Sequence, residues 1–290
     1  MTNQVVLVTG TSSGLGLETA IYLAERGFRV YATMRNLAKR RQLDEEAARR
    51  DVQVQVLQLD VTDRASVEAA VKEVVAQTGE IFAVVNNAGT QIRGFFEDMS
   101  DAEIRRVFET NVFGTMAVTR AVLPHMRESR QGRIVIMTSI SGRIGAMALS
   151  AYSSTKFALE GFGEALSLEV APLGLSVSLV EPGLIQTEIW GSNRHVAHHV
   201  AQHAGSHKSP YWAWFNNLEA LTDKLIRSSP TTMRDVAVVV HEALVATRPR
   251  LRYLVGRRAK MLYALRRYLP DGLFEWLYFR ASHRAIGAVE

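Results

Sequence analysis

Short apolar runs alternate with longer amphipathic stretches along most of the chain. Runs typical of buried strands occur at residues 5–8, 28–34, 52–59, 81–85, 133–138, 175–180 and 251–255. Stretches with helical spacing of apolar residues lie between them, at 17–24, 37–50, 62–77, 100–127, 151–169 and 234–247. This regular exchange of strand and helix is typical of an α/β fold.

The alternation stops between residues 184 and 232, and this long polar and aromatic segment is a candidate substrate lid. Its histidines are His195, His198, His199, His203 and His207. No Asp, Glu or Cys nearby completes a ligand set, so we expect no metal ion. Four aromatic residues follow: Tyr211, Trp212, Trp214 and Phe215. They serve either to cover an apolar ligand or to pack the lid on the body, and the pattern leaves both open.

Composition narrows the class of protein. The 290 residues are 47% apolar and 22% charged, which is typical of a globular chain long enough for a large core. The absence of cysteine excludes disulfides and thiolate chemistry. We find no secretion signal and no apolar stretch of the ~20 residues that a membrane span needs, so we expect a cytoplasmic protein.

The positive charge is concentrated in the C-terminal part of the chain. Residues 248–290 hold ten Lys or Arg and three Asp or Glu, whereas the whole chain has a net charge of +5. The body is therefore slightly acidic, which argues against a nucleic-acid binder. Residues 257–290 form a basic amphipathic extension that either touches an anionic membrane surface weakly or packs on the body or a partner subunit. Packing is favoured, because the apolar residues between Leu273 and Phe279 hold no strict face.

A glycine-rich loop joins the first strand to the first helix. It reads Thr9-Gly10-Thr11-Ser12-Ser13-Gly14-Leu15-Gly16. Gly10 permits a tight turn, and Gly14 and Gly16 let the backbone approach a pyrophosphate at the start of the helix. In this setting the loop predicts dinucleotide binding.

The end of the second strand indicates which dinucleotide is bound. Folds that prefer NAD usually have an acidic residue there, to hold the ribose hydroxyls. Here the strand ends in Thr33-Met34-Arg35-Asn36, and Arg35 would pair with a 2′-phosphate. With the Ser13 hydroxyl in the loop, this predicts NADP(H).

Three polar residues from one strand–helix unit form a candidate proton-transfer site. Ser139 follows the strand at 133–138, and Tyr152 and Lys156 lie one turn apart on the next helix. An ammonium beside a phenol lowers the phenol pKa from ~10, and Ser139 can hydrogen-bond the same oxygen. Such a site suits a carbonyl/alcohol pair. Two more strands end in Asn86-Asn87-Ala88-Gly89 and Glu181-Pro182-Gly183, which are typical of a ligand crevice.

These motifs occur together in one known family. The glycine loop, Asn86-Asn87-Ala88-Gly89, Asn111, Ser139, Tyr152-x-x-x-Lys156 and Pro182-Gly183 resemble the short-chain dehydrogenases/reductases over about residues 4–255. The resemblance implies a Rossmann-type, doubly wound, parallel seven-stranded sheet. One domain would then span residues 1–256, with the helical lid inside it and the extension 257–290 after it. It also implies a homodimer or homotetramer.

The resemblance further implies a role for each matching position. Tyr152 would be the general acid/base, Ser139 would orient the substrate oxygen, and Lys156 would lower the Tyr152 pKa and hold the nicotinamide ribose. Asn111 would anchor a water that links Lys156 to solvent. The implied cofactor-binding residues are Gly10, Ser12, Ser13, Gly14, Leu15, Gly16, Arg35, Asp60 (at the adenine), Val61, Asn87, Ala88, Gly89, Tyr152, Lys156, Pro182, Gly183, Ile185 and Thr187 (at the carboxamide).

Within the family, two segments are similar to the 17β-hydroxysteroid and retinol dehydrogenase branch. They are residues 30–35, VYATMR, and residues 156–161, KFALEG. The predicted activity is hydride transfer between NADP(H) and a hydrophobic carbonyl or alcohol, such as a steroid, retinoid or acyl ketone. The alternatives are a regulatory module that senses NADP(H) without turnover, and a membrane-surface scaffold that rests on the extension alone.

Overall fold

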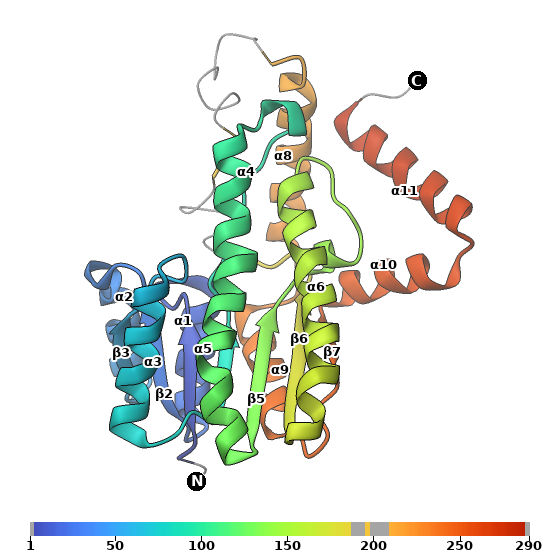
Figure 1. Cartoon of the computed structure of the whole chain (residues 1–290). Coiled ribbons are helices and arrows are strands. Elements are labelled where there is room, and N and C mark those ends of the chain that lie inside the picture. The colour runs from blue at the N-terminus through green and yellow to red at the C-terminus, as the bar shows by residue number, and fades with distance from the viewer. Residues whose placement is uncertain (1–2, 187–194, 198–208, 288–290) are drawn as a thin grey trace.

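The structure, a computed structural model, describes residues 3–186, 195–197 and 209–287 (Figure 1). All seven strands of its sheet run parallel, in the order β3-β2-β1-β4-β5-β6-β7. They are β1 (Val5–Thr9), β2 (Arg29–Met34), β3 (Gln55–Gln58), β4 (Ala83–Asn86), β5 (Gly132–Met137), β6 (Leu175–Pro182) and β7 (Arg252–Val255). The Rossmann-type, doubly wound sheet predicted from the sequence is confirmed.

Helices cover both faces of this sheet (Figure 1). They are α1 (Gly14–Glu25), α2 (Arg41–Arg49), α3 (Arg64–Thr78), α4 (Asp101–Phe108), α5 (Gly114–Ser129), α6 (Ser150–Val170), α8 (Trp212–Arg227), α9 (Met233–Val245), α10 (Arg257–Tyr268) and α11 (Asp271–Ile286). In the lid region, α8 is the helix that the structure describes. Thr187 and the histidines His198, His199, His203 and His207 lie outside the described residues.

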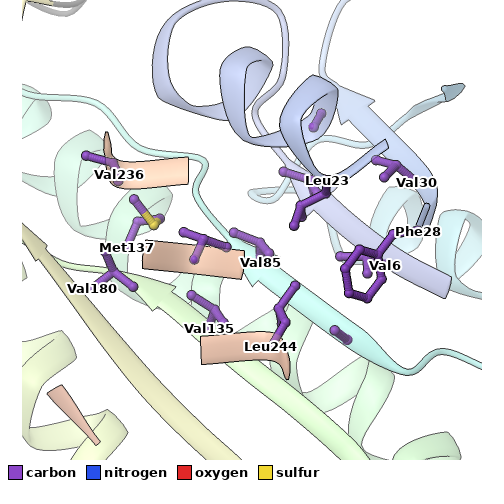
Figure 2. Packing of buried hydrophobic residues seen from close by; sticks show 14 of the residues in the cluster. Val6, Leu23, Phe28, Val30, Val85, Val135, Met137, Val180, Val236 and Leu244 are labelled. Carbon is purple, nitrogen blue, oxygen red and sulfur yellow. The ribbon is translucent and has the colours of Figure 1, made fainter. Parts of the chain in front are cut away.

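The strands are apolar on both sides because two separate cores enclose the sheet. Alternate residues of β1 point to opposite faces. Val6 and Val8 belong to the core that contains residues of α1 and α9, and Figure 2 shows part of this core around Val6. Val5 and Leu7 belong to the core that contains residues of α3, α5 and α6. All four of these side chains are buried. Burial on both faces explains why the strands read as continuous apolar runs.

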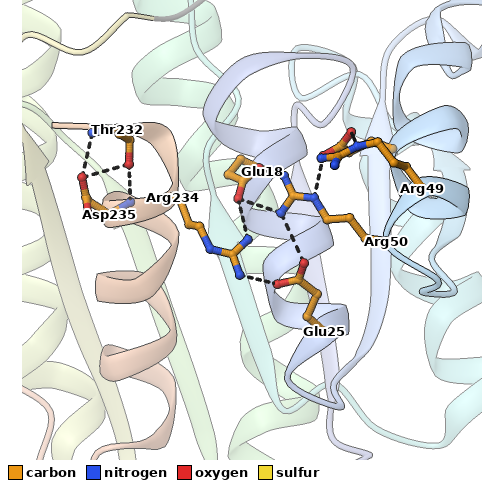
Figure 3. A network of polar contacts seen from close by, with 8 residues as sticks. Glu18, Glu25, Arg49, Arg50, Thr232, Arg234 and Asp235 are labelled. Atoms are coloured by element: carbon orange, nitrogen blue, oxygen red, sulfur yellow. Dashed lines mark hydrogen bonds and ion pairs between the residues drawn. The ribbon is translucent and has the colours of Figure 1, made fainter. Parts of the chain in front are cut away.

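A network of charges fastens α1 to its neighbours (Figure 3). Arg50, just after α2, pairs with Glu18 and Glu25 of α1 and with Glu46, and Arg234 of α9 also pairs with Glu18 and Glu25. Hydrogen bonds from Arg49 and Arg50 lower the pKa of Glu46 to about 2. The network fixes the helix whose first turn belongs to the glycine loop.

The prediction of one continuous helix over residues 100–127 is wrong in the middle of this range. Ser100 and Glu103 form a capping box at the start of α4, but a π-helical turn, Glu109–Phe113, separates α4 from α5. A π turn adds a residue to the helical repeat and is common at functional sites. The turn contains Asn111, whose side chain is thereby directed into the protein.

Two further elements differ from their predicted ranges. The stretch predicted as one helix at 37–50 is a 3₁₀ turn, Leu37–Lys39, followed by α2. The third strand is limited to β3, which is half as long as its alternating pattern. No helix in the described part of the chain is both long and apolar enough to span a bilayer.

Candidate active site

A cavity of about 480 Å³ opens at the carboxyl ends of the strands. It lies where the strand order reverses, between β1 and β4, which is where open parallel sheets bind ligands. Its lining residues are Gly10, Ser12, Ser13, Gly14, Leu15, Gly16, Met34, Arg35, Lys39, Leu59, Asp60, Val61, Thr62, Asn87, Ala88, Gly89, Thr90, Arg106, Thr110, Met137, Thr138, Tyr152, Lys156, Pro182 and His195.

The glycine loop fits tightly against the end of β4. Gly10 has a φ of +72°, and a Cβ atom there would lie 2.8 Å from the Cα of Ala88. A Cβ on Gly16 would lie 2.2 Å from the Gly10 carbonyl oxygen and 2.3 Å from Asn87 Nδ2. Only glycine therefore fits at either position, and α1 begins inside the cavity with its first N–H groups.

Asn87 holds the loop in this position. Its Nδ2 donates to the carbonyl oxygens of Thr9 and Gly10 at 2.9 and 3.1 Å. The hydroxyl of Thr9 accepts hydrogen bonds from the backbone N–H groups of Asn87 and Ala88, both at 3.0 Å. The side chain of Asn87 thus shapes the cavity floor from the protein side.

Tyr152, Lys156 and Ser139 meet at the other end of the cavity. Tyr152 and Lys156 lie one turn apart on α6, and the Lys156 Nζ is 5.5 Å from the centre of the phenol ring. This ammonium donates to the Met137 carbonyl oxygen at 2.8 Å. Ser139 follows β5, and its hydroxyl accepts a hydrogen bond from the Ser141 N–H at 3.1 Å and donates to the Pro182 carbonyl oxygen at 3.5 Å. It also lies close enough to the Tyr152 phenol to lower the phenol pKa. The three residues grouped by the sequence are brought together.

The pKa of Tyr152 differs from the sequence expectation. Burial raises it to about 12, and the neighbouring Ser139 hydroxyl opposes that rise only in part. Burial also lowers the pKa of Lys156 to about 8, against the charge of Glu160. The lowering of the Tyr152 pKa expected from Lys156 is therefore wrong for this structure, because desolvation of the phenol dominates.

Asn111 is buried and braces the site from the π turn. Its Oδ1 accepts from the Thr90 N–H at 2.8 Å, and its Nδ2 donates to the Thr90 carbonyl oxygen at 2.8 Å and to the Thr155 hydroxyl at 3.0 Å. Thr155 precedes Lys156 on α6. Asn111 thus joins the segment after β4 to the catalytic helix, and its water-holding role stays a prediction.

Most of the predicted cofactor residues line the one cavity. Among the described ones, Gly183 and Ile185 lie outside its lining, and so do Ser139 and Asn111 of the predicted catalytic set. Ile185 is a core residue, only 2% exposed. A Cβ on Gly183 would lie 2.9 Å from the Cβ of Ala259, so this glycine permits close contact with α10.

Three further cationic or titratable residues line the cavity and were not predicted from the sequence as part of it: Lys39, Arg106 and His195. Burial, followed by the charges of Arg106, Arg35 and Lys39, lowers the pKa of His195. The three cations therefore gather at one end of the cavity. Arg35 and Lys39 are four residues apart, whereas Arg106 comes from a distant segment. One feature of the sequence could have indicated that Arg106 lies at the cavity. Arg106 and Thr110 are four residues apart and so share a helix face.

The predicted aromatic residues of the lid pack partly on the body. Phe215 is buried against Ile92, Met99 and Val107, and Tyr211 stacks on Phe95 at 4.8 Å between ring centres. The packing role left open by the sequence therefore holds for Phe215. None of the four lid aromatics lines the described cavity.

The donor set of the cavity fits a nicotinamide dinucleotide. Helix N–H groups and a glycine cradle that any Cβ would fill suit a pyrophosphate. Cations stand at one end, and a phenol and an amine stand at the other. A redox dinucleotide that spans the switch point would thus reach both groups.

Comparisons with known proteins agree with this geometry. A family model described as short chain dehydrogenase matches residues 4–197. The chain is 37% identical over 277 residues to the uncharacterised oxidoreductase YusZ of Bacillus subtilis, which covers 95% of this chain and 97% of that protein. It is 36% identical over 285 residues to retinol dehydrogenase 8 of Bos taurus, covering 97% and 89%.

A solved structure is similar as well. An actinorhodin polyketide ketoreductase determined with NADPH has a TM-score of 0.74 and 29% identity, covering 87% of this chain and 95% of that one. The protein therefore belongs to the short-chain dehydrogenases/reductases, a family of oxidoreductases, and within it to relatives of the retinol and 17β-hydroxysteroid dehydrogenases.

Proposed function

We propose that this oxidoreductase uses NADP(H) and transfers hydride to or from a hydrophobic carbonyl/alcohol substrate. The observation that carries the coenzyme choice is the set of cations at the end of the cavity next to β2. Arg35, Lys39 and Arg106 line it together, and no acidic residue ends β2. Three cations favour a 2′-phosphate, whereas a carboxylate at the end of β2 would repel it.

The protonation states of Tyr152 and Lys156 support reduction of a carbonyl as the direction of the reaction. A bound nicotinamide dinucleotide supplies the hydride. With a pKa of about 12, the Tyr152 phenol keeps its proton at neutral pH and can donate it to a carbonyl oxygen that gains negative charge. Ser139 lies beside the same phenol, where its hydroxyl can orient the substrate oxygen. Lys156, with a pKa of about 8, remains largely charged near neutral pH and stabilises that developing charge.

An apolar substrate is supported by the neighbourhood of the catalytic helix. Ala148 and Ala151, just before Tyr152, belong to a buried apolar cluster with Ile92 and with Phe215 of α8. This cluster gives the start of α6 an apolar border with few polar groups to hydrogen-bond a ligand. Retinol dehydrogenase 8, a relative with a named apolar substrate, is similar over nearly the whole chain.

The coenzyme choice is tested by reversing the charge of Arg35. Arg35→Asp should raise the Kd for NADPH by about tenfold or more and change the Kd for NADH far less, because a charge-assisted phosphate contact is lost. Arg41→Asp makes the same charge change on α2, outside the cavity lining, and serves as the matched control. Coenzyme fluorescence titration measures both constants. Equal affinities of the parent protein for NADPH and NADH would refute the coenzyme proposal.

A further inference from the structure

The C-terminal helices expose a row of large apolar side chains to solvent. On α10 these residues are Met261, Leu265 and Tyr268, with exposed fractions of 62%, 43% and 77%. On α11 they are Leu273, Trp276, Leu277 and Phe279, with exposed fractions of 45%, 55%, 44% and 56%. The spacing of three and four residues places those of α10 on one face. We call these seven residues the outer face.

Part of the opposite face of the two helices packs on the body. Ala259, Phe274 and Ile286 are buried. The Tyr278 hydroxyl donates to the Gly145 carbonyl oxygen at 2.8 Å, and the Asn217 amide of α8 donates to the Ile286 carbonyl oxygen at 3.0 Å. The packing favoured by the sequence thus accounts for the inner face and leaves the outer face unexplained.

Cations accompany the outer face on the same two helices. Residues 257–287 contain seven Lys or Arg and only two acidic residues. Arg280 lies over the Trp276 ring at 5.2 Å and Arg267 over the Tyr268 ring at 5.8 Å, so charge and aromatic surface occur side by side. Of these seven cations, only Arg266 forms an ion pair within the part of the chain that the structure describes, with Asp271.

We propose that the outer face of α10 and α11 binds an anionic lipid surface. Aliphatic and aromatic side chains enter the boundary of the acyl chains, while arginines contact the headgroup phosphates above it. A second copy of the chain fits less well, because a two-fold contact would place two strongly basic faces together and the cores of protein interfaces are depleted of charge. Four aliphatic residues also favour hydrocarbon over the stacked bases of a nucleic acid.

The attachment would bring the lipid surface close to the catalytic end of the molecule. The Arg143 guanidinium donates to the Tyr263 hydroxyl of α10 at 2.7 Å, and Tyr278 of α11 holds Gly145. Both contacts reach the segment that follows Ser139. An apolar substrate dissolved in the bilayer would then have a short path to the site. This advantage depends on the proposed function, whereas the binding itself does not.

The test is co-sedimentation of the full-length protein with lipid vesicles. Vesicles of phosphatidylcholine with phosphatidylserine should bind the parent, and salt should weaken that binding. The double variant Trp276→Ala, Leu277→Ala should bind about tenfold more weakly or worse, since both side chains lose burial in lipid. Arg280→Glu with Arg284→Glu should lose the preference for phosphatidylserine. Leu168→Ala, at an even more exposed site on α6, should bind like the parent.

Several outcomes would overturn the proposal. They are an absence of binding to phosphatidylserine vesicles, or equal binding by the parent and the outer-face variants. A change from dimer to monomer in the outer-face variants without vesicle binding would assign the surface to a second copy. Binding to single-stranded RNA in place of vesicles would assign it to nucleic acid. Coenzyme titration of every variant reports folding, and its result stays separate from the vesicle result.

Discussion

Single residues in this site owe their chemistry to burial more than to their sequence neighbours. The spacing of Tyr152 and Lys156 correctly places them together, yet the sign of the Tyr152 pKa shift depends on how completely the folded protein surrounds the phenol. Burial is a property of the tertiary structure, so sequence spacing could not predict it. The same reason explains why Arg106 was missed, since the fold alone brings it to Arg35.

A buried cluster behind the catalytic helix shows the same effect. Glu181 at the end of β6 is 1% exposed, and Arg143 and Arg252 lie 3.7 Å from its Oε1. Burial first, and then the charge of Glu160, raises the pKa of Glu181 to about 7. The folded state therefore holds this proton more tightly than the unfolded chain, in which the pKa is 4.5. The contribution of Glu181 to the free energy of unfolding is therefore greatest below pH 4.5. It is lost as the pH rises through about 7 and the buried carboxyl ionises.

Glu181→Gln should remove this pH dependence, because the amide does not ionise. Between about pH 5 and pH 8, the Tm of the parent should fall by ~3 °C or more relative to the variant. Thermal melts across this pH range measure the difference. Glu164→Gln is the control of opposite sign, because hydrogen bonding to Arg252 lowers the pKa of the exposed Glu164. Parallel melting curves of parent and Glu181→Gln would contradict the assignment.

Helices and strands are predicted best from the sequence where a single physical cause, such as burial of both faces, sets their pattern. The strands were predicted from the sequence because two cores bury both of their faces, which makes their residues read as continuous apolar runs. The π turn Glu109–Phe113 was missed because one extra residue in a helical repeat barely disturbs the apolar pattern. The glycine loop was predicted with its function, since its strand and helix flank it directly.

A test of the loop compares two glycines. Gly16→Ala should destabilise the protein by roughly 1–3 kcal/mol and weaken coenzyme binding, because the new Cβ would overlap the Gly10 carbonyl oxygen and the Asn87 amide. Gly161→Ala, in the exposed interior of α6 with open space around its Cβ, should instead stabilise by about 0.5–1 kcal/mol. Denaturant unfolding and coenzyme titration provide the two readouts. Equal effects of both substitutions would contradict the tight fit.

At the scale of the whole molecule, some parts follow from local patterns and others are held by contacts between distant segments. The sheet, its order and the glycine loop follow from local patterns repeated along the chain. The lid and the C-terminal helices depend on contacts between distant segments, such as the buried ion pair of Arg93 with Glu219 of α8. The packing of these helices could not be predicted from the sequence, because neither Arg93 nor Glu219 belongs to a recognisable motif. Such a division is common in folds that host many functions, because the site is built on a scaffold whose core depends on local patterns.

The central claim is that Tyr152 donates a proton while hydride passes to a hydrophobic carbonyl. The most direct measurement follows NADPH absorbance with a panel of steroid, retinoid and acyl ketones, for the parent and for Tyr152→Phe. The parent should oxidise NADPH with at least one ketone, and Tyr152→Phe should lower kcat by about 10²–10⁴-fold while the Kd for NADPH stays nearly unchanged. Full activity in Tyr152→Phe would contradict the claim, and tight NADPH binding without turnover on any ketone would favour a sensing module instead.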